Sequence, residues 1–235
     1  MKSIQYLKDG FTLANNNLSL FVIGFLLSLL FYHSEIMTYP GSEALSFVFV
    51  FIYIGYHLSI PLFLSIKQAK KKLPFSDILK TSFINLKRSL MQIILLTLLF
   101  MGIIIFVYMM MSFISNGNGD FLAFIQQGTN QLFAVLFYGL LSLFIFTSIY
   151  FSIEKVGFFR STIKSIKYSF QHVSFIVIVG ILYIISYVLS AYIYDSISKP
   201  INIVLQSGLF DYMELVLVSS AYYCYLEGKK GRKKK

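Results

Sequence analysis

The segment RSTIKSIKYSFQHVSFIVIVGILYIISYVLS, residues 160–190, contains both features that decide the fold. Its first eight residues include three basic side chains at helical spacing, and no charged residue follows Lys167 within the segment. A helix needs roughly 20 apolar residues to cross a hydrocarbon core of about 30 Å. The segment therefore predicts a basic amphipathic helix at a membrane surface, followed by a helix that spans the membrane.

Apolar runs of this kind recur along the whole chain of 235 residues. Hydrophobic residues make up 57% of the sequence and charged residues only 13%, which is far from the composition of an average soluble domain. The predicted spans are residues 18–37, 44–66, 91–114, 131–153, 173–194 and 203–226. We therefore expect an all-α membrane protein, a single domain over residues 1–235 whose six transmembrane helices form three helix hairpins.

The basic residues indicate how the chain is oriented. Of the twenty Lys and Arg residues, nineteen lie in segments that would share one side of the membrane, and Lys199 alone lies on the other. Short loops rich in Lys and Arg stay on the cytoplasmic side. We therefore expect a multi-pass protein of the cell membrane with both termini in the cytoplasm. The same rule accounts for the net charge of +10, so no nucleic-acid partner is expected.

A four-residue pattern, Lys-x-small-Phe, precedes the first, third and fifth predicted spans. It occurs as Lys8-Asp9-Gly10-Phe11, Lys80-Thr81-Ser82-Phe83 and Lys167-Tyr168-Ser169-Phe170. Apolar residues around each copy recur at intervals of three and four, which indicates one face of an α-helix. The chain is therefore interpreted as a threefold internal repeat with units 1–72, 73–159 and 160–235. Each unit is expected to contain a helix lying along the inner membrane surface, a span that turns upward from it, an outer loop and a second span.

Basic side chains on and beside these surface helices are the first set of candidate binding residues. Amphipathic helices attract anionic lipid headgroups, at roughly 1 kcal/mol for each Lys or Arg near the surface. The candidates for binding lipid headgroups or a cytoplasmic protein partner are Lys8, Lys80, Lys87, Arg88, Arg160, Lys164 and Lys167.

Ionisable residues inside the predicted spans form the second candidate site. Glu214 lies near the middle of the sixth span, Asp211 lies one turn away on the same face, and His57 lies in the second span. Such a group costs roughly 2.5 kcal/mol or more unless it is partnered or hydrated. If the second and sixth spans are neighbours, His57 can reach Glu214. The residues form either a proton or cation site or a structural hydrogen bond between helices, unless the sixth span starts later and both acids lie among the outer headgroups.

Signatures of catalysis, cofactors and metals are missing from the sequence. It contains no Gly-x-Ser-x-Gly, His-Glu-x-x-His, Walker or Gly-x-Gly-x-x-Gly motif, so neither an enzyme nor a bound cofactor is expected. His33 and His172 are predicted at opposite faces of the bilayer and cannot share a metal ion, so no metal site is predicted. Cys224 is the only cysteine, which excludes an intrachain disulfide.

Three short motifs resemble a known family of membrane domains. They are Leu73-Pro74-Phe75 after the second span, Glu154-Lys155-Val156-Gly157-Phe158-Phe159 before the basic helix, and Ala221-Tyr222-Tyr223-Cys224-Tyr225-Leu226 at the end of the sixth span. They are similar to motifs of the six-helix membrane domain attached to some glycerophosphodiester phosphodiesterases and of related prokaryotic integral membrane proteins. The resemblance implies the fold and a membrane role. It does not imply phosphodiesterase activity, because the soluble catalytic barrel is absent from these 235 residues and the family's usual Asp-Leu-Arg is replaced by Tyr225-Leu226-Glu227.

The sequence therefore favours a non-catalytic membrane scaffold that binds anionic lipid or a protein partner through its surface helices. The alternative is a transporter or permease subunit with an ion or proton site at His57 and Glu214. The two hypotheses differ in the residues that matter, which are basic surface residues in the first case and intramembrane residues in the second.

Overall fold

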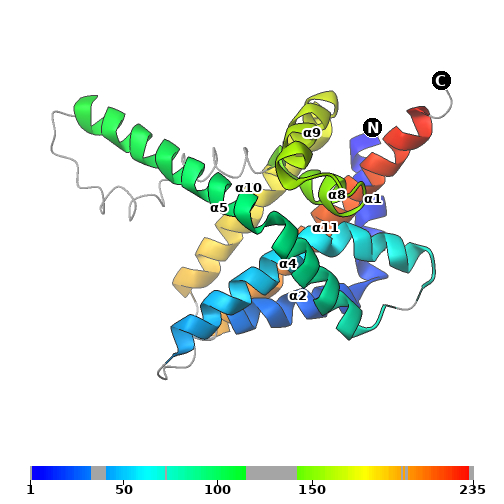
Figure 1. Cartoon of the computed structure of the whole chain (residues 1–235), viewed down its shortest axis with the longest axis horizontal. Helices are drawn as coiled ribbons and strands as arrows, with labels where there is room; N and C mark the ends of the chain where they lie inside the picture. The colour runs from blue at the N-terminus through cyan, green and yellow to red at the C-terminus, as the bar shows by residue number, and fades with distance from the viewer. Residues whose placement is uncertain are drawn as a thin grey trace.

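The computed structural model describes residues 2–32, 41–71, 73–114, 142–196, 198 and 201–232, and these residues are helical with short connections and no strand (Figure 1). The helices are α1 Lys2–Asn15, α2 Leu18–Phe31, α4 Ser42–Gln68, α5 Phe75–Ile114, α8 Thr147–Ser152, α9 Phe158–Gln171, α10 Val173–Ser196 and α11 Ile201–Arg232. The prediction of an all-α chain is confirmed for this part of the protein.

Three of the described helices are long and apolar enough to cross a membrane. They are α4, the Val173–Ser190 part of α10, and the Ile201–Lys229 part of α11. The pair α1 and α2, bent by 78° at its break, adds a fourth if it forms one broken span. The membrane class predicted from composition is thus supported by individual helices of sufficient length.

Two predicted spans lie partly or mostly outside the described residues. Residues 33–37 of the first span are among those not described, and α2 alone, with 14 residues, is only about 21 Å long. Of the fourth span, 131–153, only residues from 142 onward are described, including α8. The third span forms the second half of α5, which extends away from the other helices in Figure 1.

Helices α1 and α9 end where the sequence predicts a turn into a span. Asn16 and Asn17 separate α1 from α2, and the Asn17 side chain donates a hydrogen bond to the Leu13 carbonyl at 2.8 Å. Asn favours turns because its side chain competes for backbone hydrogen bonds. His172 occupies the corresponding position between α9 and α10.

One expectation about a helix end is wrong, and one helix extends beyond its predicted span. The residues before the third span do not form a separate surface helix, because α5 runs without a break from Phe75 to Ile114. The physical reason is local, since residues 84–93 contain neither Gly nor Pro and only one Asn, so nothing there interrupts the helix. At the other end of the chain, α11 continues past the predicted limit of 226 into the basic tail, as far as Arg232.

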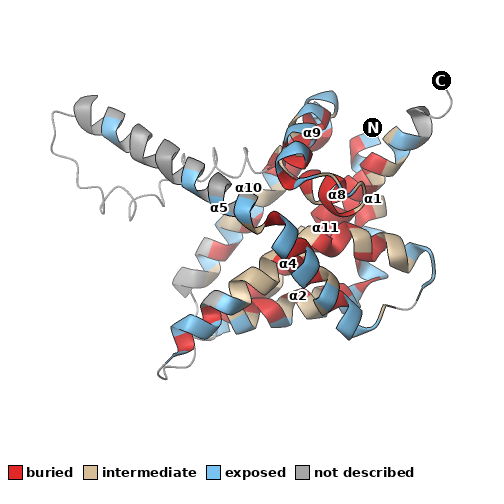
Figure 2. Ribbon diagram, viewed as in Figure 1, coloured by how far each residue is buried: buried red, intermediate tan, exposed pale blue. Residues whose placement is uncertain are grey.

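The first helix of the chain packs against the last. Gly10 of α1 lies so close to Ser220 of α11 that a Cβ atom at Gly10 would be 2.5 Å from the Ser220 Cα. Ser220 lies in the buried stretch of α11 that extends from Leu215 to Tyr222, and Figure 2 shows this part of the helix in red. This contact brings the two ends of the chain to the same end of the molecule (Figure 1).

Small residues also lie at two further close contacts, one between α4 and α5 and one between α9 and the segment before α8. Gly55 of α4 packs against Ser82 of α5, where a Cβ atom at Gly55 would be 3.1 Å from the Ser82 carbonyl carbon. Ser165 and Ser169 of α9 donate hydrogen bonds to the carbonyl of Leu143, before α8, at 2.8 and 2.9 Å. Close approach through small residues is a common way for membrane helices to associate.

Candidate functional site

The structure brings His57, Asp211 and Glu214 together, because α4 and α11, which carry them, are neighbours. His57 Nδ1 of α4 lies 2.9 Å from Glu214 Oε1 of α11, and His57 Nε2 lies 3.6 Å from Asp211 Oδ1. Neither ring nitrogen makes a hydrogen bond of good geometry. The interaction of the imidazole with the two carboxyl groups is therefore mainly electrostatic. We call these three residues, together with Tyr53, the acidic cluster.

Tyr53 completes the cluster from one turn earlier on α4. Its hydroxyl donates a hydrogen bond to Asp211 Oδ1 at 2.7 Å, and its ring centroid lies 4.1 Å from that of His57. The Asp211 side chain is only 1% exposed, and within the described residues its second oxygen, Oδ2, has no hydrogen-bond partner. Glu214 is more exposed than Asp211, so the two acids have different surroundings.

Helix α2 closes the third side of the acidic cluster. The Tyr56 hydroxyl of α4 donates a hydrogen bond to the Leu20 carbonyl, which fixes α4 against α2. A Cβ atom at Gly24 would lie 3.1 Å from the Tyr56 ring and 3.8 Å from Asp211 Oδ1, so the backbone of α2 passes directly beside the acid. Among the described residues, no Lys or Arg forms an ion pair with either acid.

The cluster can exchange protons more readily than it can hold a metal ion. A carboxylate that touches an imidazole in a poorly hydrated site is a typical proton-binding arrangement. Within the part of the chain that the structure describes, no group of three or more His, Cys, Asp and Glu side chains has the geometry to hold a metal ion. The acidic cluster is therefore interpreted in terms of protons and charge.

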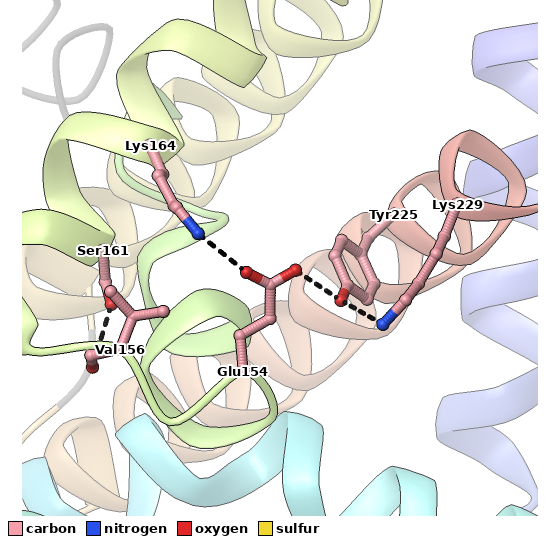
Figure 3. Close-up of polar contacts among 6 residues, drawn as sticks. All are labelled: Glu154, Val156, Ser161, Lys164, Tyr225 and Lys229. Atoms are coloured by element: carbon pink, nitrogen blue, oxygen red, sulfur yellow. Dashed lines mark hydrogen bonds and ion pairs between the residues drawn. The ribbon is translucent and has the colours of Figure 1, made fainter. Parts of the chain in front are cut away.

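A second polar cluster joins the Glu154 loop to α9 and α11 (Figure 3). Glu154 Oε2 accepts a hydrogen bond from Lys164 Nζ at 3.0 Å, and Glu154 Oε1 accepts one from the Tyr225 hydroxyl at 2.9 Å. Lys229 Nζ in turn donates to the Tyr225 hydroxyl at 3.2 Å. Burial alone would raise the pKa of Glu154, but the hydrogen bonds from Lys164 and Tyr225 outweigh it and lower that pKa. We call these four residues the Glu154 cluster.

The loop that carries Glu154 is shaped by its own backbone contacts. Lys155 adopts a positive φ of 53° two residues before Gly157, the N-cap of α9. The Ser161 hydroxyl donates a hydrogen bond to the Val156 carbonyl at 3.3 Å, to the left of Glu154 in Figure 3. The loop therefore presents Glu154 toward Lys164, which is ten residues further along the chain.

The candidate basic residues are all exposed, but two of them are engaged within the protein. The exposed set is Lys8, Lys80, Lys87, Arg88, Arg160, Lys164 and Lys167. Lys164 pairs with Glu154. The Arg88 guanidinium lies 4.9 Å from the centre of the Phe151 ring and donates to the Lys155 carbonyl at 3.3 Å. These two side chains have protein partners and are poorer candidates for lipid binding than the other five.

The phenylalanine of each Lys-x-small-Phe copy is exposed beside its lysine. The exposed fractions are 48% for Phe11, 64% for Phe83 and 67% for Phe170. The small residue between them is buried in every copy, as Gly10, Ser82 and Ser169. Large apolar side chains that point away from the protein on three separate helices are suited to contact with lipid.

Sequence reasoning named Lys164 but missed Tyr53 and the other members of the Glu154 cluster, which are Glu154, Tyr225 and Lys229. A weak signal existed for Tyr53, because it precedes His57 by four residues and therefore shares its helix face. No comparable signal connects Glu154 with Tyr225, which are 71 residues apart.

Comparisons with known proteins add no relative. No protein-family model, no curated protein and no solved structure matches the chain. The resemblance to the membrane domain of glycerophosphodiester phosphodiesterases therefore stays a prediction.

Proposed function

We propose that this chain is a non-catalytic, six-span protein of the cell membrane that binds anionic lipid headgroups through three basic surface segments. Both termini are cytoplasmic in this proposal, and the spans form three hairpins from three repeated units. The binding residues are the motif lysines Lys8, Lys80 and Lys167, with Lys87 and Arg160 beside them. Lys164 and Arg88 serve mainly within the protein, because each already has a protein partner.

The exposed Lys–Phe pair of each unit is the observation that carries the proposal. Lys8 and Phe11, three residues apart on one helix, are neighbours on the surface, and both are exposed. The pairs at Lys80 and Lys167 repeat this arrangement. In a surface helix the aromatic ring enters the boundary between headgroups and acyl chains, while the ammonium group stays at the level of the phosphates.

The packing of the small motif residues supports three related units. Each lies against the second span of a different unit: Gly10 on α11, Ser82 on α4, and Ser169 on the segment before α8. Two of these contacts join elements close in sequence, and the contact between α1 and α11 joins the first unit to the last. A cyclic order of this kind is expected for parallel repeats around an axis along the membrane normal.

Lipid counting tests the proposal directly. The purified protein would be titrated with phosphatidylglycerol or phosphatidylcholine, and bound lipids would be counted by native mass spectrometry. We expect a preference for phosphatidylglycerol that falls about fivefold for each of the substitutions Lys8→Gln, Lys80→Gln and Lys167→Gln, which corresponds to roughly 1 kcal/mol per charge. Lys199→Gln is the matched control, because Lys199 lies on the predicted outer side, and it should leave the preference unchanged. An unchanged preference in the triple variant would refute the lipid role.

Cysteine labelling tests the orientation. In a background with Cys224→Ala, Lys199→Cys should react with a membrane-impermeant thiol reagent added to intact cells, whereas Lys80→Cys should react only after permeabilisation. The reverse pattern would contradict the cytoplasmic placement of the surface helices.

Transport is a second candidate function, and the acidic cluster is the observation that favours it. Two acids and a histidine meet between α4 and α11, inside helices that are apolar enough to cross a membrane. The test is proton uptake into proteoliposomes under a potassium diffusion potential. The protein should increase uptake, and Glu214→Gln should abolish that increase while leaving the phosphatidylglycerol preference intact. Uptake equal to that of empty liposomes would rule out a proton pathway.

A further inference from the structure

With both carboxyl groups ionised, the acidic cluster has a negative charge that no Lys or Arg of the described residues neutralises. If His57 is protonated and both acids are ionised, the three side chains sum to one negative charge, and a neutral His57 leaves two. The described structure shows no Lys or Arg paired with Asp211 or Glu214. An unpaired charge among buried helices is costly, so the cluster favours any state that removes it.

Asp211 is the member of the cluster where this charge is least satisfied. Its Oδ1 accepts from the Tyr53 hydroxyl, and His57 Nε2 lies 3.6 Å from the same oxygen. Its Oδ2 is buried and without a partner in the described residues. Glu214, by contrast, is partly exposed and has His57 Nδ1 at 2.9 Å. The bare oxygen of a fully buried carboxyl group is thus the position at which an added proton relieves the most unfavourable charge.

The groups that face Asp211 and Glu214 from the neighbouring helices do not change this conclusion. Helix α4 contributes the hydroxyls of Tyr53 and Tyr56 beside His57, and α10 contributes Tyr183 near Glu214. From the α2 side, Gly24 lies beside Asp211, and Tyr32 is close enough to interact with Tyr53. These tyrosines are neutral near pH 7 and can donate or accept hydrogen bonds, but they supply no positive charge.

A second polar group without a partner lies on the same face of α11. Ser207 precedes Asp211 by four residues, it is buried, and within the described residues its Oγ has no hydrogen-bond partner. Residues four apart lie one above the other on a helix. Asp211 Oδ2 and Ser207 Oγ are therefore two polar atoms without partners among the described residues, one turn apart on α11, and Ser207 lies nearer the start of the helix.

We propose that Asp211 is an exchangeable proton-binding site: the cluster holds one proton on His57 and binds a second on the Asp211 carboxyl group. The inference rests on the transport candidate and deepens it, because it names Asp211 as the carboxyl group that binds the proton, but equilibrium binding of a proton does not require flux. A sodium ion is the competing occupant. It needs several oxygen ligands, whereas His57 occupies the side of both acids that a cation would use.

Carbodiimide labelling of the wild-type protein tests the site. Dicyclohexylcarbodiimide reacts with protonated carboxyl groups in apolar surroundings: the carboxyl O–H adds across a C=N bond, and the product rearranges to a stable N-acylurea without a leaving group. The labelled residue is then located by proteolysis and mass spectrometry. We expect the adduct on Asp211, with a yield that falls as the pH is raised and does not change when sodium replaces potassium at constant pH. Asp77, which is exposed at the start of α5, is the internal reference and should stay unlabelled.

The outcomes separate this inference from the transport candidate. Labelling of Asp211 in a protein that shows no proton uptake keeps the proton site and removes transport. The absence of an Asp211 adduct at every pH, labelling of Glu214 alone, or protection by sodium at constant pH would each overturn the proton site. As a second measurement, His57→Gln removes the neighbouring positive charge, so Asp211 labelling should persist to a higher pH than in the wild-type protein. An unchanged pH profile in this variant would show that His57 does not share protons with Asp211.

Discussion

Replacement of Gly10 by alanine should loosen the contact between the two ends of the chain. A Cβ atom at Gly10 would overlap the Ser220 hydroxyl and lie 2.5 Å from both the Cα and the N atom of Ser220. A side chain could rotate away, but the backbone of α11 cannot. Because ordinary van der Waals contact begins near 3.4 Å, α1 would have to retreat from α11 by about 1 Å.

The expected loss follows from two opposing contributions. Overpacking costs about 1–3 kcal/mol, and a collision with backbone atoms belongs at the upper end of that range. The higher helix propensity of alanine relative to glycine stabilises the folded state by roughly 1 kcal/mol. The net destabilisation of Gly10→Ala should therefore be about 2 kcal/mol, which corresponds to a decrease in Tm of about 4–8 °C for a chain of this size.

Cys224 provides the assay, because it is the only cysteine and is fully buried. A thiol-reactive fluorophore should label it only on unfolding, so the fluorescence of the detergent-purified protein during heating reports Tm. Gly208→Ala is the matched control, since the nearest atom to a Cβ there is 3.7 Å away on Phe25, at an ordinary contact distance. Gly208→Ala should unfold at the wild-type temperature or slightly above it. If Gly10→Ala also did so, the close packing of α1 on α11 would be refuted.

The same assay tests two further contacts. Glu154→Gln removes the negative charge that pairs with Lys164 and should cost about 1 kcal/mol at pH 7. Folding lowers the pKa of Glu154 from its ordinary value of 4.5. This stabilisation is therefore present above pH 4.5 and is lost as the pH falls through the folded pKa. A difference in Tm between variant and wild type that stayed constant down to acid pH would contradict it. Tyr53→Phe removes the donor to the buried Asp211 Oδ1 and should cost about 1–3 kcal/mol, whereas Tyr192→Phe, at a residue that is 71% exposed, should cost nothing measurable.

The acidic cluster could be predicted in part from helical periodicity and from the cost of charged residues in a membrane. Periodicity alone places Asp211 and Glu214 on one face of α11, and the cost of a charge in the membrane directs attention to them. The contact with His57 could be anticipated from the relative depths of two spans. The hydrogen bond from Tyr53 could not, because it depends on the rotation of α4 about its own axis, and packing between helices decides that rotation.

The ion pair of Lys164 with Glu154 could not be predicted from the sequence. In the sequence Lys164 is one of three basic residues between Phe158 and Gln171, and only its place outside the Lys-x-small-Phe motif separates it from Lys167. In the structure Lys164 forms an ion pair with Glu154 of the preceding loop, whereas Lys167 has no ion pair among the described residues. The loop before α9 places Glu154, and the periodic pattern of a helix contains no information about the conformation of a loop.

The Lys-x-small-Phe pattern can be explained by three environments around the motif of each proposed unit, which are a neighbouring helix, the acyl chains and the lipid headgroups. The small residue must be small because a neighbouring helix passes over it, as at Gly10 against Ser220. The phenylalanine must be apolar because it points away from the protein, and the lysine one turn before it lies beside this apolar surface. Protein, acyl chains and headgroups would thus each select one position of the motif. Lys164 lies outside the motif and is paired with an acid, which is why lipid binding should depend on Lys167 more than on Lys164.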